Sequence, residues 1–129
     1  MKKTFLLIFI ILISNACASR LRCCEKKEDV SELLTGYWKE KNSKSTSLFM
    51  YSFNQHQGHY TEVEPTVHKG AYFIIDDHSF VDIIKNGRGF DLHFTDMSGN
   101  QISKIKFLDQ QQLILEMGGI ATEFIKVAE

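Results

Sequence analysis

The chain is poor in several residue types. It has a single proline, a single tryptophan and three cysteines, and no cysteine follows residue 24. The chain after that point therefore has no disulfide framework and no cysteine-based zinc site. The formal net charge is only −1, so no excess of positive charge attracts nucleic acid, and no nucleic-acid partner is expected.

What the chain does have is enough apolar residues for one core. Hydrophobic residues make up 43% of its 129 residues and aromatic residues 12%. Disordered segments lack aromatic side chains, and this length suits one domain. We therefore expect a single folded domain.

The N-terminus has the pattern of an export signal. Lys2 and Lys3 precede an apolar run over residues 5–13, and small or polar residues follow at 14–19. A transmembrane helix needs about 20 apolar residues, so this shorter run indicates a cleaved signal peptide over residues 1–16. The protein is expected to be exported.

The cleavage site decides whether the mature protein is tethered. Ala16-Cys17 resembles the end of a bacterial lipoprotein signal, in which the cysteine carries lipid, and we favour lipidation of Cys17. Cleavage before Ser19 by an ordinary signal peptidase is the alternative. The first outcome gives a membrane-anchored lipoprotein of the cell envelope, and the second gives a soluble periplasmic or secreted protein.

Residues 17–29 are mostly charged and are expected to form a tether, with the domain spanning residues 30–129. Cys23 and Cys24 are adjacent, about 3.8 Å apart at Cα, which is closer than disulfide-bonded cysteines usually lie. A bridge between them would be strained, and the sequence leaves open whether the two thiols stay reduced. Residues 31–34 are expected to form one helical turn capped by Asp29 or Ser31.

Beyond this turn the apolar residues alternate with polar ones, as in strands. Phe90, Leu92 and Phe94 alternate with polar residues, and Phe49, Tyr51 and Phe53 form a second stripe. Turn residues recur about every ten positions. The pattern predicts strands near 36–41, 46–54, 59–64, 68–75, 79–85, 89–96, 101–108, 112–117 and 120–127.

Short connections between so many strands predict an all-β fold. An antiparallel up-and-down meander of this length must protect its edges, and closure into an eight-stranded barrel is the simplest way to do so. A two-sheet sandwich is the alternative, although its crossings normally need longer connections.

The segment Leu34-Thr35-Gly36-Tyr37-Trp38 resembles the opening of the lipocalin-like families, in which a short turn leads to Gly-x-Trp at the first barrel strand. Residues 31–128 are similar to small lipocalin-like domains of Bacteroidetes lipoproteins. The resemblance implies that Trp38 closes one end of the barrel, next to Gly36, with Lys126 of the last strand over its indole ring. The simpler interpretation makes Trp38 the largest core residue.

One face of the expected barrel is rich in rings, and these are the candidate ligand-binding residues: Phe49, Tyr51, Phe53, Tyr72, Phe90 and Phe94. An eight-stranded barrel is just wide enough to be filled by side chains or to hold one small ligand. Both outcomes remain open.

No catalytic residue, cofactor or metal site is predicted. His56 and His59 flank a turn, but a metal site needs three or four converging ligands, and the sequence shows no known catalytic motif. The hypothesis is a barrel that binds a small hydrophobic molecule in the cell envelope. The alternative is a filled barrel that engages another envelope protein.

Overall fold

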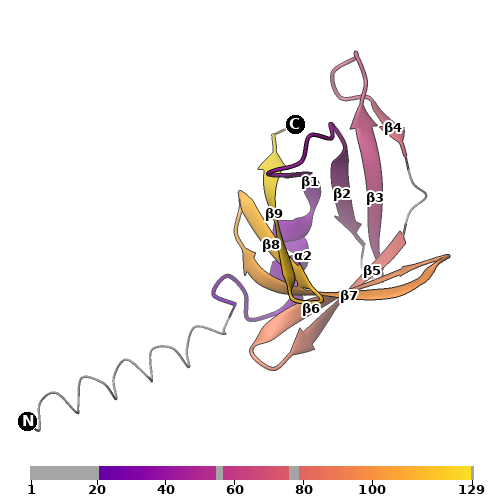
Figure 1. Cartoon of the computed structure of the whole chain (residues 1–129). Helices are drawn as coiled ribbons and strands as arrows, with labels where there is room; N and C mark the ends of the chain where they lie inside the picture. Colours follow the sequence, from indigo (N-terminus) through magenta and orange to yellow (C-terminus); the bar gives the residue numbers. More distant parts are fainter. Residues whose placement is uncertain (1–20, 55–56, 76–78, 129) are drawn as a thin grey trace, which may run out of the picture.

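The computed structural model describes residues 21–54, 57–75 and 79–128. Within these ranges the chain forms one helix and nine strands, shown in Figure 1. The elements are α2 (Lys27–Leu34), β1 (Gly36–Glu40), β2 (Leu48–Phe53), β3 (Gly58–Pro65), β4 (Tyr72–Ile74), β5 (Ser79–Asn86), β6 (Gly89–Asp96), β7 (Gly99–Leu108), β8 (Gln112–Met117) and β9 (Ile120–Val127).

Eight of the strands form a closed antiparallel barrel. The sheet runs in the order β2-β1-β9-β8-β7-β6-β5-β3-β4, and an additional pairing of β2 with β3 closes the ring. β1 also pairs with β9, so the first and last strands of the chain lie side by side (Figure 1). The predicted all-β, eight-stranded up-and-down barrel is confirmed, with β4 as one extra strand.

β4 lies outside the ring, along the edge of β3 that also holds β5. Tyr60 pairs with Ser79 of β5, whereas Val63 pairs with Ile74 of β4. The sequence predicted a longer strand over residues 68–75, but residues 66–71 form a turn instead. Gly70 there has a φ of +84°, and the Thr66 N–H bonds to the Ala71 carbonyl oxygen, so pairing starts only at Tyr72.

One end of the barrel is covered and the other is open. α2 leads through Thr35 directly into β1 and packs against β2, β5 and β7, so the barrel end at Gly36 is covered. Because the strands run up and down, the loop after β1 and the turns after β3, β6 and β8 all lie at the opposite end. This difference between the ends positions the candidate site.

The helix is longer than the sequence indicated and is capped differently. It begins at Lys27, and the Asp29 carboxylate accepts a hydrogen bond from the Lys26 backbone N–H at 3.1 Å. Asp29 is therefore the third residue of the helix and accepts a hydrogen bond from the N-cap residue, Lys26. The expectation that Asp29 or Ser31 would be the N-cap residue is wrong. A carboxylate in the first turn also interacts favourably with the helix dipole.

Part of the expected tether packs onto the barrel. Leu21 and Cys24 are buried members of the main core, and the Lys85 ammonium donates to the Glu25 carbonyl oxygen. The packed part of the chain therefore starts before Val30. Cys23 and Cys24, whose redox state the sequence left open, form a disulfide. The expected signal peptide 1–16 and Cys17 lie outside the described residues.

Candidate functional site

The covered end is built around Trp38, which is fully buried. Its indole Nε1 donates a 2.8 Å hydrogen bond to the Leu34 carbonyl oxygen at the end of α2. The Lys126 ammonium donates to the Leu33 carbonyl oxygen at 2.9 Å and lies 5.3 Å from the centroid of the indole ring. The last carbonyl groups of the helix thus receive two donors, one of them charged.

Gly36 completes this arrangement because it lies against Lys126. A Cβ atom at Gly36 would lie 3.0 Å from Cε of Lys126, and the φ of Gly36 is +131°. The structure therefore brings Gly36, Trp38 and Lys126 together at the covered end. Their geometry holds α2 on the barrel, and none of the three lines the pocket at the open end.

The covered half of the barrel interior is filled. Phe90, Leu92 and Leu113 are almost fully buried, together with Val30 and Leu34 of α2. Close packing of this kind leaves no room for a ligand. A ligand site inside the barrel must therefore lie towards the open end.

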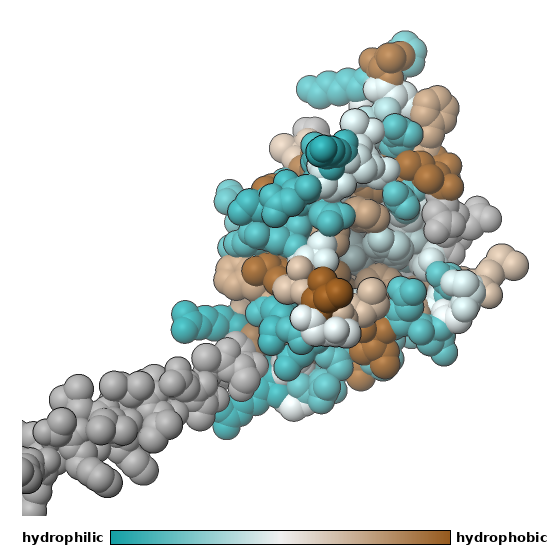
Figure 2. Space-filling model, in the orientation of Figure 1, coloured by the Kyte–Doolittle hydropathy of each residue, from teal (hydrophilic) through white to brown (hydrophobic). Residues whose placement is uncertain are grey.

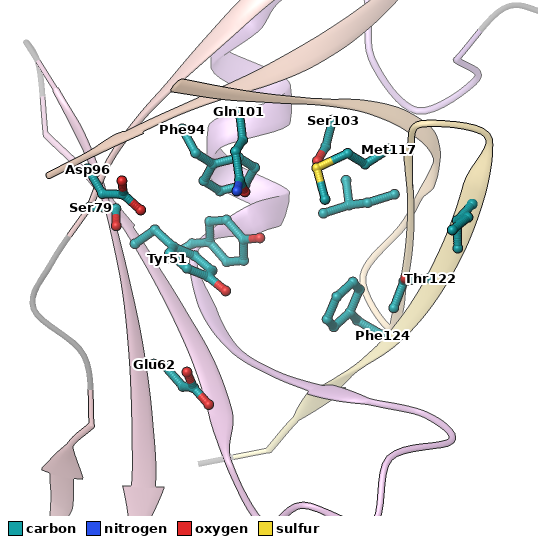
Figure 3. A pocket seen from close by; sticks show the side chains of 13 residues that line it. Tyr51, Glu62, Ser79, Phe94, Asp96, Gln101, Ser103, Met117, Thr122 and Phe124 are labelled. Carbon is teal, nitrogen blue, oxygen red and sulfur yellow. The ribbon is translucent and has the colours of Figure 1, made fainter. Parts of the chain in front are cut away.

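The open half contains a pocket of about 400 Å³. Four rings form much of its wall: Tyr51, Tyr60, Phe94 and Phe124. Figure 3 shows Tyr51, Phe94 and Phe124 around the pocket, with α2 visible behind them. The volume lies within the range that is usual for small-molecule sites.

The rings hold one another in place. The centroids of Tyr60 and Phe94 are 5.2 Å apart in an edge-to-face contact, and those of Tyr51 and Tyr60 are 5.1 Å apart. Phe124 meets Phe49 edge-to-face at 5.6 Å. Such pairs are favourable beyond the area that they bury, so the aromatic wall is pre-formed.

Polar side chains share the pocket with the rings. Two carboxylates, Glu62 on β3 and Asp96 at the end of β6, line it. The other polar lining residues are uncharged: Ser79, Gln101, Ser103 and Thr122. Figure 3 shows Asp96 next to Ser79, and Glu62 on the same side of the pocket. The wall can therefore make both apolar contacts and hydrogen bonds.

Two ionisable groups of the pocket have shifted pKa values. Burial, with the neighbouring Tyr60 as a smaller cause, raises the pKa of the Tyr51 phenol well above its usual value. Hydrogen bonds from the Ser98 hydroxyl and backbone N–H lower the pKa of Asp96, which is exposed. At neutral pH Tyr51 is therefore an uncharged phenol and Asp96 is ionised.

The six ring residues predicted as ligand-binding fall into separate places. Tyr51 and Phe94 line the pocket. Phe49 packs behind the wall, against Phe124 and Tyr60. Phe90 belongs to the filled core. Phe53 lines a separate depression between α2 and β5 on the covered side.

Tyr72 lies away from the pocket, on the extra strand β4. Its ring stacks on that of Tyr37 with 4.6 Å between centroids. Leu48 and Val63 are also buried but do not belong to the main core. Alternation along β2 and β3 turns their side chains away from Tyr51 and Tyr60, so a second apolar contact area lies on the outside of the barrel.

The sequence interpretation did not include Tyr60, Glu62 and Phe124. Their signal was the period-two pattern itself, since residues 58, 60 and 62 share one face of β3 and residues 120, 122 and 124 share one face of β9. The pattern alone does not tell which face of β3 or β9 points into the barrel. The pairing of neighbouring strands decides this, and it places Tyr60 opposite Tyr51 and Phe124 opposite Leu113.

The histidines do not gather into a site in the described part of the chain. His59 contacts the ring of Phe80, and His93 pairs across strands with Asp82. His56 and His78 lie outside the described residues. In residues 21–54, 57–75 and 79–128, no three His, Cys, Asp or Glu side chains are grouped so that they could hold a metal ion.

Within the same ranges no helix has the length and apolar character needed to cross a membrane. Comparison of the chain with protein-family models, with the curated proteins and with the solved structures found no match.

Proposed function

We propose that this protein is a small-molecule-binding barrel of the cell envelope and that its ligand occupies the pocket in the open half. The observation that supports the proposal is a cavity of about 400 Å³ walled by Tyr51, Tyr60, Phe94 and Phe124. The covered half of the barrel is filled by side chains, and the pocket lies in the open half.

The wall suits a molecule with an apolar body and at least one polar group. Aromatic faces offer apolar contact at little cost in side-chain entropy, because paired rings are already held in place. Ser103 and Thr122 add hydroxyl groups that can donate or accept hydrogen bonds. A purely aliphatic ligand would leave these groups without partners.

The envelope location rests on the N-terminal sequence, in which Cys17 is the proposed lipid carrier. Leu21 packs in the core, and four extended residues span at most about 14 Å. A barrel anchored through Cys17 would therefore sit close to the membrane surface. The intact mass of the mature protein should start at Cys17 and include acyl chains, and Cys17→Ser should remove them. An unmodified start at Ser19 would contradict the anchor.

The binding proposal is tested with a substitution that fills the pocket. Thr122 lines the pocket from β9, so Thr122→Phe places a ring in the space that a ligand would use. The probe is N-phenyl-1-naphthylamine, an uncharged dye whose emission rises in apolar surroundings. We expect saturable binding to the wild-type protein and at least about a tenfold loss of affinity in Thr122→Phe, because a filled cavity excludes the probe.

Ala121→Phe is the matched control. Ala121 is the preceding residue on β9, is exposed and does not line the pocket. The same ring added there should leave the affinity for the dye unchanged. Equal binding by wild type and Thr122→Phe would show that the dye binds elsewhere, and absence of binding to the wild-type protein would contradict the proposal.

An interaction surface is the second candidate function, and exposed apolar side chains on and after β4 favour it. Phe73 and Ile74 are 66% and 64% exposed, Ile75 is also exposed, and Val67 is fully exposed in the turn that projects at the top of Figure 1. Figure 2 shows hydrophobic side chains over this region of the surface. A protein that fails to bind the dye but co-purifies with another envelope protein, and loses it in Phe73→Ser, would support this function.

A further inference from the structure

We infer that the ligand of the open pocket is an organic cation, a protonated amine on an apolar or aromatic body. This inference rests on the proposed small-molecule function and specifies its ligand class. It follows from the charges of the side chains that line the cavity and from the aromatic rings between them.

Both charged side chains in the pocket wall are acidic. Glu62 lies on β3 two residues beyond Tyr60, and Tyr60 pairs with Ser79 of β5. Asp96 follows Thr95, which pairs with Phe80, so Asp96 is one strand further along the same wall. The two carboxylates thus flank Ser79 on one side of the pocket (Figure 3).

No positive charge balances them among the described residues that line the pocket, because none of these is Lys, Arg or His. Lys126 is engaged at the covered end, with Trp38 and the Leu33 carbonyl oxygen. Lys41 forms its ion pair with Glu123, which does not line the pocket. An anionic ligand would therefore meet two like charges, and a cation would meet opposite ones.

Both carboxylates keep hydrogen-bonding capacity for a ligand. Asp96 is ionised at neutral pH, and its hydrogen bonds from Ser98, which lower its pKa, go to Oδ1. Within the described part of the chain, no side chain forms a hydrogen bond or ion pair with the Glu62 carboxylate, which is only partly exposed. A ligand ammonium would give Glu62 such a partner.

The rings complete the case for a cation. The rings of Tyr51, Tyr60, Phe94 and Phe124 line the same space, and a cation is attracted to an aromatic face within about 6 Å. An aromatic or aliphatic body can pack against the same rings. The uncharged Tyr51 phenol can accept a hydrogen bond from an ammonium group without repelling it.

Three matched probes test the inference by isothermal titration calorimetry on the mature protein at pH 7. They are 2-(1-naphthyl)ethylamine, which is protonated, 2-(1-naphthyl)ethanol, which is neutral, and 1-naphthylacetate, which is anionic. We expect the amine to bind about tenfold more tightly than the alcohol, since a hydrogen bond to a charged group is worth about that factor. The anion should bind more weakly than the alcohol.

Glu62→Gln isolates the charge, because glutamine keeps the size of the side chain. It should weaken amine binding about tenfold and leave the affinity for the alcohol unchanged. Glu32→Gln removes the same charge from the exposed surface of α2 and should alter neither affinity.

Each outcome has one meaning. Equal binding of the amine and the alcohol, or tighter binding of the anion, would overturn the cation inference while supporting the binding proposal. An amine preference that survives in Glu62→Gln and in Glu62→Gln/Asp96→Asn would also overturn it. Binding of none of the three probes would overturn the small-molecule function itself.

Discussion

Trp38→Ala is expected to lower the free energy of unfolding by about 3–5 kcal/mol, the usual cost of removing a large buried aromatic side chain. Trp38 is fully buried, and its loss also removes the donor to the Leu34 carbonyl oxygen and the ring beneath the Lys126 ammonium. The result should appear in urea unfolding followed by circular dichroism, because the variant has no tryptophan fluorescence.

Lys126→Met tests how much the Lys126 charge contributes to stability while the Trp38 ring stays in place. Methionine keeps much of the apolar stem but loses the charge and the donor to the Leu33 carbonyl oxygen. We expect a loss of roughly 1–3 kcal/mol, because a cation over an indole ring and one charged hydrogen bond are each modest contributions.

A loss below about 1 kcal/mol for Trp38→Ala would contradict the view that these contacts fix α2 on the barrel.

Gly58→Ala is the second substitution with a large expected effect. Gly58 is a buried residue at the start of β3, and a Cβ atom there would overlap the Val81 carbonyl oxygen and lie 2.5 Å from Cε1 of Phe53. The neighbour across the sheet is backbone and cannot swing aside, so the strands must move apart. Overpacking of this kind costs about 1–3 kcal/mol or more, measurable as a lower midpoint in urea unfolding.

Gly89→Ala is the control for Gly58. Gly89 is also a buried glycine at the start of a strand, but the nearest atom to an added Cβ is the Asn86 carbonyl oxygen at 3.9 Å. Its substitution should change stability by no more than about 0.5 kcal/mol. If both variants unfold at the same midpoint, the close approach of β3 to β5 at Gly58 is not what constrains this position.

The strands and their closure were predictable because this chain alternates so regularly. Phe90, Leu92 and Phe94 do share the inward face of β6, where they pair with inward positions of β5 and β7. The turn after β5 contains Gly87 and the turn after β6 ends at Gly99, both with positive φ, and sequence patterns reveal such glycines well. Alternation and turn spacing are local properties, so a single sequence expresses them.

The pocket was less predictable because alternation tells which face a side chain takes but not its height in the barrel. Phe90 and Phe94 share one face, yet Phe90 is buried in the filled half and Phe94 lines the pocket. Their heights depend on the hairpin turns and on the pairing of β1 with β9, contacts between distant parts of the chain. A list of inward rings therefore mixed core residues with residues that line the pocket.

The packing of the N-terminal segment was also hard to predict from the sequence, for a different reason. Residues 21–26 look like a charged linker, and only Leu21 and the two cysteines are apolar. Leu21 and Cys24 nevertheless join the core. An isolated apolar residue in a charged segment shows no periodicity, so its burial depends on the surface that the rest of the fold offers it.

The most direct test of the central claim, that the open half of the barrel is the binding site and the covered half is core, is a chemical-shift map of N-phenyl-1-naphthylamine binding by two-dimensional NMR. We predict large, saturable shifts for Tyr60, Phe94 and Thr122 around the pocket, and small shifts for Trp38 and Leu113 in the filled half. Shifts confined to β4 and the turn before it, with none around the pocket, would contradict the claim.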